Sequence, residues 1–129
     1  MASVTYTGAF PADLLNMNDG NGTPWARRQL KERREAWHQL GWAMGNSVRP
    51  KPAIVGRADV TLEVGTNRPF HRRDPHNFMP TMKYLIDGFT AARLWPDDNS
   101  KYVHTNEPIF TAAIPHRTVR VTIQWEEAA

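Results

Sequence analysis

The sequence predicts an α+β fold in which two helices pack on one mixed sheet. The pair Thr23-Pro24 is typical of a helix start, and apolar residues at helical spacing follow it. Residues 82–89 show the same spacing, whereas residues 57–64 and 119–125 alternate between apolar and polar positions, as half-buried strands do. Helical and strand segments in this arrangement favour helices packed on a single sheet.

Local residue preferences predict the remaining elements. Asp74 stands where it could cap a helix, but Pro80 would break a helix that began there, so the second helix is expected from Met79 or Pro80. In chain order the predicted elements, β-α-β-α-β-β, are a strand at 3–7, a loop at 12–23, a helix to about Met44, a strand at 57–64, a turn or short helical piece at 75–78, the second helix, a turn at 96–99, strand-like pieces at 101–105 and 109–114, and a strand at 119–125.

The regularly spaced apolar residues are expected to form one core. Trp37 and Trp125 fall on predicted core faces, whereas Trp95 adjoins two aspartates, where packing or stacking on a base would both suit it. The other predicted core positions are Ala26, Leu30, Leu40 and Met44 on the first helix, Met82, Leu85, Ile86 and Phe89 on the second, and Ala58, Val60, Leu62 and Val64 on a strand.

Length and composition limit the class of protein. The chain of 129 residues is expected to form a single domain, 1–129, with a substantial core. The absence of cysteine excludes disulfides, thiolate zinc sites and thiol nucleophiles. No apolar run approaches the ~18–20 residues of a membrane span, and no secretory signal is recognisable, so a soluble cytoplasmic protein is expected.

Basic residues are concentrated in one segment. The net charge is +3, and residues 27–34 hold five cations against Glu32 alone. Arg27, Lys31, Arg34 and His38 recur at helical spacing, so they form a stripe on one helix face. Such a stripe is typical of a phosphate-binding face, although a solvated helix surface has the same pattern.

Acidic residues surround the second predicted helix. Asp74 precedes it, Asp87 lies one turn after Lys83 on it, and Asp97-Asp98 follow it. Carboxylates can bind Mg²⁺, and a lysine can stabilise charge on a phosphoryl group, so these groups suit phosphodiester hydrolysis. Each piece also has a simpler explanation: a helix cap for Asp74, a turn for Asp97-Asp98 and a surface ion pair for Lys83 with Asp87.

The ordered motifs are similar to one enzyme family. The patterns Arg-Arg-Asp-x-x-Asn at 72–77, Lys-x-x-x-Asp-Gly at 83–88 and Trp-x-Asp-Asp at 95–98 resemble RusA-type Holliday-junction resolvases. The resemblance covers roughly residues 12–105. It implies a RusA-like fold and a homodimeric, Mg²⁺-dependent endonuclease of bacteria or their phages. Such an enzyme resolves four-way DNA junctions by paired symmetric nicks.

The resemblance also implies roles for individual residues. Asp74 and Asp98 match metal-binding positions and Lys83 matches the catalytic lysine, while Asp97, Asp87 and His76 are further metal-site candidates. His76 stands where the family has a second aspartate. It would act as an imidazole ligand that admits Mn²⁺ beside Mg²⁺, as a phosphate contact, or as a bystander. The predicted DNA contacts are Arg72, Arg73, Arg27, Lys31 and Arg34 on phosphates, with Asn16 and Asn18 near the junction.

Two other functions fit the same sequence. A catalytically silent protein on this scaffold would bind junctions, more weakly at high salt, without metal-dependent nicking. A small structural protein of a phage particle, with an incidental basic helix, would not prefer branched over linear DNA. A dedicated zinc site is disfavoured, because the histidines lack the His-x-x-x-His spacing and no cysteine is present.

Overall fold

The computed structural model describes residues 1–19, 22–67 and 74–126, and it confirms the predicted α+β class. The elements are β1 (Ala2–Ala9), α1 (Pro24–Gly45), β2 (Ala58–Gly65), the short 3-10 helix η1 (Pro75–Phe78), α2 (Met79–Ala91), β3 (Val103–Thr105), β4 (Ile109–Thr111) and β5 (Thr118–Trp125).

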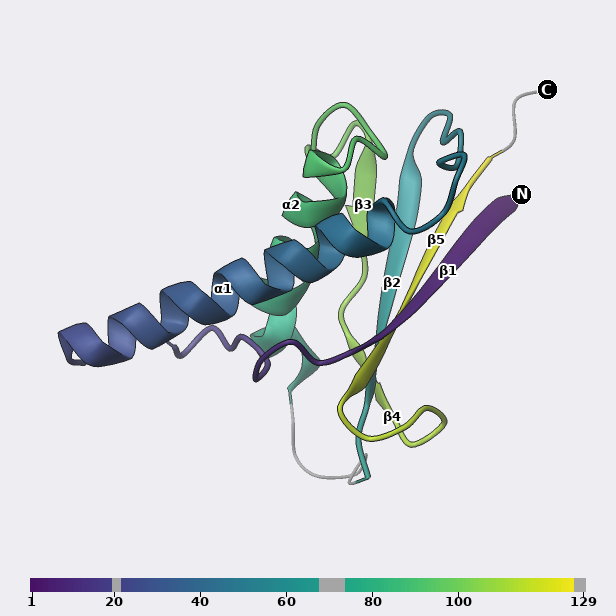
Figure 1. Ribbon diagram of the computed structural model, residues 1–129. Coiled ribbons are helices and arrows are strands. Elements are labelled where there is room, and N and C mark those ends of the chain that lie inside the picture. Colours follow the sequence, from purple (N-terminus) through teal and green to yellow (C-terminus); the bar gives the residue numbers. More distant parts are fainter. Residues whose placement is uncertain (20–21, 68–73, 127–129) are drawn as a thin grey trace.

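The strands form one mixed sheet with β5 and β2 at its centre. β1 pairs with β5 and β5 with β2, both antiparallel, along eight-residue strands. β3 and β4 both run parallel to β2, β3 beside its first residues and β4 beside its last. The two short strands thus lie end to end along one edge (Figure 1), so the order β-α-β-α-β-β holds if they are taken as one interrupted strand.

The edge strands β3 and β4 are shorter than the predicted 101–105 and 109–114. Lys101 and Tyr102 belong to a turn, in which the backbone N–H of Tyr102 donates to the carbonyl of Asn99 at 3.0 Å. After Thr111, residues 112–114 form bends and do not pair with β2. Local residue preferences predicted extended backbone in both segments, but pairing with β2 decides where each strand begins and ends.

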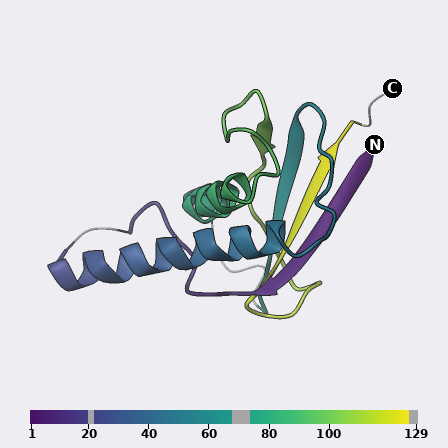
Figure 2. The same cartoon turned by 45° about the horizontal axis from the view of Figure 1, so that its top comes forward.

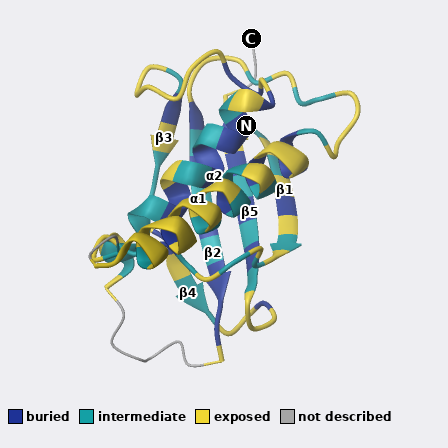
Figure 3. Cartoon of the chain, turned by 60° about the vertical axis from the view of Figure 1, so that its left-hand side comes forward, coloured by how far each residue is buried: buried dark blue, intermediate teal, exposed yellow. Residues whose placement is uncertain are grey.

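Both long helices cover the same face of the sheet (Figures 1 and 2). Thr23 caps α1 as expected, since its hydroxyl accepts the N–H of Ala26 at 3.1 Å, and Pro24 is the first helical residue. The N-terminal half of α1 extends beyond the sheet edge, and much of its surface is exposed (Figure 3). No helix in the described part of the chain combines the length and apolar character that a membrane span requires.

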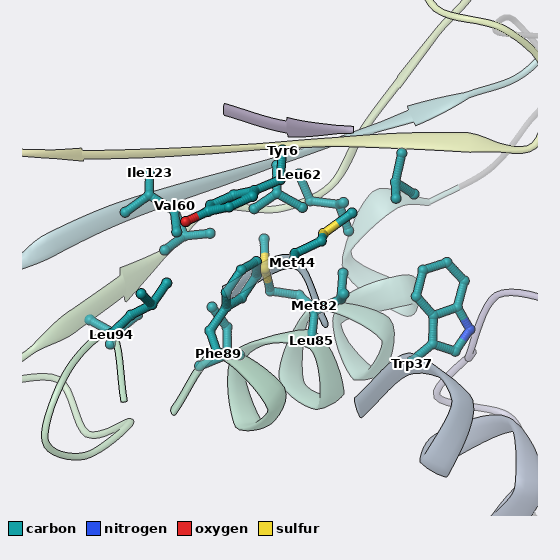
Figure 4. Packing of buried hydrophobic residues seen from close by; sticks show 14 of the residues in the cluster. Tyr6, Trp37, Met44, Val60, Leu62, Met82, Leu85, Phe89, Leu94 and Ile123 are labelled. Atoms are coloured by element: carbon teal, nitrogen blue, oxygen red, sulfur yellow. The ribbon is translucent and has the colours of Figure 1, made fainter. Parts of the chain in front are cut away.

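The core lies between the helices and the sheet (Figure 4). The predicted strand face, the α2 face and Leu30, Trp37 and Met44 of α1 are buried, whereas Ala26 and Leu40 are half-buried. Trp125 is buried as expected, and the open choice for Trp95 is resolved in favour of packing, since it is 4% exposed. Trp25 and Trp42 on α1 remain exposed.

Candidate functional site between the two helices

The helices α1 and α2 cross in backbone contact at Gly41 and Gly88. A Cβ on Gly41 would overlap the carbonyl oxygen of Leu85, and a Cβ on Gly88 would overlap that of His38. A residue with a side chain would force the helices apart at either position. Asp87 immediately precedes Gly88, so the close crossing brings its carboxyl within the electrostatic influence of His38 on α1.

The carboxyls of Asp87 and Asp98 meet beside this crossing. Asp87 lies on α2 and is half-buried, while Asp98 lies on the turn after α2. The pKa of Asp87 is raised to about 6, first by burial and then by a hydrogen bond to Asp98 and the negative charge of Asp98, while the charges of Lys83 and His38 oppose the rise. Asp87 therefore holds a proton more tightly than an ordinary aspartate, and in its protonated form it can donate a hydrogen bond to Asp98.

The neighbouring Asp97 organises the turn instead of facing Asp87. One of its carboxylate oxygens accepts the backbone N–H of Asp98 at 2.8 Å, and the other accepts the side-chain amide of Asn99 at 3.1 Å. The simpler explanation of Asp97 as a turn residue accounts for these contacts. The two adjacent aspartates thus have different surroundings: Asp97 shapes the backbone, and Asp98 extends towards α2.

Two hollows adjoin Asp98 and together make a surface that we call the α1–α2 groove. The first has a volume of about 510 Å³ and contains Lys83 and His76. The second has a volume of about 940 Å³ and contains Asp87 and His38. Arg34, Tyr84 and Asp98 line both hollows, so these residues mark the place where the hollows join.

Part of the predicted basic stripe lies along this groove. Arg34 lines both hollows and Lys31 lines the second, and both side chains are exposed. Arg27 is exposed near the start of α1 and lines neither hollow. The predicted phosphate contacts Arg72 and Arg73 lie outside the described residues. The groove therefore combines cations from α1 with the carboxyls of α2 and its following turn.

The loop at 12–19 is fastened beside the first hollow. The N–H of Leu15 donates to the hydroxyl of Thr81 at 2.8 Å, and that hydroxyl donates to the carbonyl of Leu15 at 2.9 Å. The side-chain oxygen of Asn16 accepts the N–H of Asn18 at 2.9 Å. Asn16 is half-buried, Asn18 is exposed, and Met17 between them lines the hollow. The loop that carries both predicted junction contacts thus reaches the groove at Met17, whereas Asn16 and Asn18 line neither hollow.

Asp74 and His76 lie at the start of η1. The carboxylate of Asp74 caps this helix by accepting the N–H of His76 at 3.0 Å. The His76 ring lines the first hollow, and its Nδ1 lies 3.5 Å from Oε1 of Glu107, both side chains being largely exposed. The predicted cap therefore exists. It occupies part of the hydrogen-bonding capacity of Asp74 and leaves carboxylate lone pairs for other partners.

Asp87 and Asp98 are the groove residues that could hold a metal ion. No three His, Asp or Glu side chains within 1–19, 22–67 and 74–126 come close enough to hold a metal ion together. Asp87 and Asp98 nevertheless offer a carboxyl pair whose combined negative charge is costly. Mg²⁺ is usually held by one or two carboxylates, with water and phosphate oxygens completing its shell, so the pair fits this ion.

Two groove residues, His38 and Tyr84, were not among the predicted site residues. His38 was recognised as part of the basic stripe, but its proximity to Asp87 follows from the crossing at Gly41 and Gly88. Tyr84 adjoins Lys83 in sequence and could have been noted for that reason. A glycine on each helix was the available signal for a close crossing, although it does not identify the partner helix.

Neither the scan against protein-family models nor the search of curated proteins finds a match to this chain.

Proposed function

We propose that the protein is a divalent-metal-dependent DNA endonuclease that cuts four-way junctions, as its resemblance to RusA-type resolvases implies. The approach of Asp87 to Asp98 is the observation that carries this proposal. It joins two motifs that are 11 positions apart in the sequence, in a groove that also contains Lys83 and basic residues of α1.

Asp98 and Asp87 are the residues that would hold Mg²⁺, or Mn²⁺ as an alternative, with Asp74 as a further candidate ligand. The ion, when bound, supplies an activated water and neutralises charge on the phosphoryl oxygens. Its binding would also favour the ionised form of Asp87, whose proton is otherwise retained by burial and by Asp98. Asp97 supports this pair by fixing the turn.

The cationic residues would act directly on the DNA. Lys83 is exposed and lines the first hollow beside Asp98, so its ammonium can reach a phosphate bound there. That charge would stabilise the negative charge that builds up as the phosphodiester is hydrolysed. Arg34 and Lys31 would bind the flanking phosphates. Hydrolysis in this way is expected to leave a 5′-phosphate and a 3′-hydroxyl.

A four-way junction is two-fold symmetric, so paired nicks require two active sites in a matching arrangement. A homodimer meets this requirement with one site on each strand. Sedimentation of the protein with and without junction DNA tests this part of the proposal. A protein that remains monomeric on the junction would contradict paired nicking. By the same resemblance, the protein would act in the cytoplasm of a bacterial cell, whether the gene is bacterial or phage-borne.

The nicking assay tests the enzyme directly. A synthetic four-way junction is incubated with Mg²⁺ or Mn²⁺ and wild type, Asp98→Asn, Asp87→Asn or Asp74→Asn. We expect symmetric nicks by wild type and a loss of at least ~100-fold for Asp98→Asn, since it removes a charged ligand. Asp13→Asn is the matched control, because Asp13 is an exposed carboxylate that lines neither hollow and pairs with Arg117.

Each result of this assay has a definite consequence. If wild type does not nick the junction with either metal, the proposed nuclease activity is refuted. If Asp98→Asn and Asp87→Asn both nick as fast as wild type, the proposed metal site is wrong, although the nuclease activity is real. Loss of activity in Asp74→Asn would support that residue as a further ligand.

A junction-binding protein without nuclease activity is the second candidate. It is favoured by His76, which stands where the resembled family has an aspartate. This candidate predicts junction binding that weakens steeply with salt and no nicking with Mg²⁺ or Mn²⁺. Equal affinity for linear and branched DNA would contradict both candidates and favour a structural role.

A further inference from the structure

Tyr84 lies where the two hollows of the groove join. Its half-buried ring packs against the core and lines both hollows, together with Arg34 and Asp98. The guanidinium carbon of Arg34 is 5.6 Å from the ring centroid, and Nζ of Lys83 is 5.7 Å from it. One aromatic ring therefore contacts a cation from each helix, beside Asp98.

The contact constrains two long side chains, of which Lys83 also acts electrostatically on Asp87. Arg34 and Lys83 are exposed, and neither forms a salt bridge with a residue in the described parts of the chain. A cation within ~6 Å of an aromatic centroid is attracted by the negative face of the ring. The Tyr84 ring is held in place by its packing against the core, so it can fix the positions of both cations.

We propose that Tyr84 is a positioning residue that holds Arg34 and Lys83 towards a phosphate bound at Asp98. This inference rests on the proposed nuclease function. Tyr84 exchanges no proton with the substrate in this arrangement and acts through the two cations. The ring is the essential part, and its hydroxyl is dispensable.

Ring and hydroxyl are separated by substitution at the same position. Tyr84→Leu and Tyr84→Met remove the ring, whereas Tyr84→Phe keeps it. We expect the single-turnover nicking rate at saturating protein to fall ~10-fold or more in the first two, because small misplacements of charged groups are costly in the transition state. Junction affinity should change less than about threefold, because the charges that bind phosphates are retained. Tyr84→Phe should nick within about twofold of wild type.

Tyr102→Leu is the matched control. Tyr102 also packs half-buried on the core and lies under a lysine, with Nζ of Lys101 at 5.3 Å from its ring centroid, but it lines neither hollow. Its nicking rate should equal that of wild type. Thermal unfolding of every variant shows whether the fold is retained. Because two ring-free variants are tested, the comparison can still be made if one of them fails to fold.

NMR chemical shifts of the DNA-free protein test the contact between Tyr84 and the two cations independently of nicking activity. The Hε protons of Lys83 and the Hδ protons of Arg34 should be shifted upfield by the ring in wild type and Tyr84→Phe, and should return to ordinary values in Tyr84→Met. Absence of these shifts in wild type would overturn the positioning role, even if no junction is nicked.

The activity results decide the remaining outcomes. If wild type nicks and the ring-free variants nick equally fast, Tyr84 does not position the cations, while the nuclease stands. If Tyr84→Phe loses as much activity as Tyr84→Leu, the hydroxyl acts instead and the inference is wrong. If wild type nicks nothing, the proposed function fails, and upfield shifts would then support a positioning role for Tyr84 in DNA binding alone.

Discussion

The carboxyl of Asp87 is held where its charge is disfavoured. It is half-buried at the helix crossing, and Asp98 is close enough to hydrogen-bond with it. Lys83 and His38 offset only part of this effect, since the pKa still rises to about 6. An uncharged residue at this position would avoid the cost of burying a charge, so the presence of a carboxyl favours a role in binding a cation or a proton.

Asp87→Asn should therefore stabilise the protein at high pH. Between pH ~4 and ~6 Asp87 binds a proton in the folded protein but releases it in the unfolded chain. The free energy of unfolding therefore falls as pH rises through this window. Above this window the ionised Asp87 lowers the free energy of unfolding by a constant amount, on the order of 1 kcal/mol after allowance for solvent screening. Urea unfolding at pH 8 should show this gain in Asp87→Asn, and unfolding near pH 4 should not.

Asp74→Asn is the control for the pH experiment, because Asp74 is not among the groups that act on Asp87. It should leave the pH dependence of unfolding in this window unchanged. Asp98→Asn should lower the pKa of Asp87, since it removes the neighbouring negative charge, and a carboxyl NMR titration measures this. A pKa for Asp87 near 4 in the wild-type protein would contradict the described geometry.

The pairing of α1 with α2 positions the site at the level of elements. Thr81 ties α2 to the loop at 12–19, and the two glycines let the helices touch. The turn that begins after α2 returns Asp98 to the same side as Asp87. The site thus depends on the spacing between two helices more than on the sheet beneath them.

Gly88→Ala tests this crossing. Alanine is favoured over glycine within a helix by ~1 kcal/mol, but the new Cβ would lie 2.7 Å from the backbone nitrogen of Trp42 and overlap the His38 carbonyl. Backbone cannot yield as a flexible side chain can, so overpacking should dominate. We expect a net loss of ~1–3 kcal/mol in unfolding free energy.

Gly8→Ala is the matched comparison for the helix crossing. Its Cβ would lie 3.0 Å from the terminal carbon of Met44, at the far end of a flexible side chain. The loss should be well below that of Gly88→Ala in the same chemical denaturation series. Equal losses in both variants would show that the helices do not depend on a close crossing.

At the scale of the whole molecule, charge is arranged asymmetrically about the groove. Lys31 and Arg34 line it, whereas Arg28 on the same helix does not. Each phosphate contact releases a counterion, so removal of one groove cation should reduce the slope of log affinity against log salt by about 1. Fluorescence anisotropy on junction DNA should show this for Lys31→Ala and Arg34→Ala.

Arg28→Ala should leave that slope nearly unchanged, although it alters the net charge equally. If all three variants reduce the slope by the same amount, binding depends on overall charge, and the groove is not the DNA-binding surface. The comparison thus separates a specific face from a general attraction of a basic protein for DNA.

Periodicity in the sequence was sufficient to determine the class of the fold and most of its elements. The start of α1 at Thr23-Pro24, the start of α2 near Pro80 and the buried face of β2 are local properties, set by capping, proline geometry and alternation. The candidate acids, the lysine and the basic stripe were likewise visible as residue types at particular positions.

Tertiary structure decided which of these residues meet. Asp98 faces Asp87 while Asp97 serves the turn, and His38 and Tyr84 join the site although neither was predicted there. These outcomes depend on the distance at which α1 crosses α2, which is a property of two surfaces separated in sequence. Local preference places a side chain on one face of its own helix. Only packing brings that face against another.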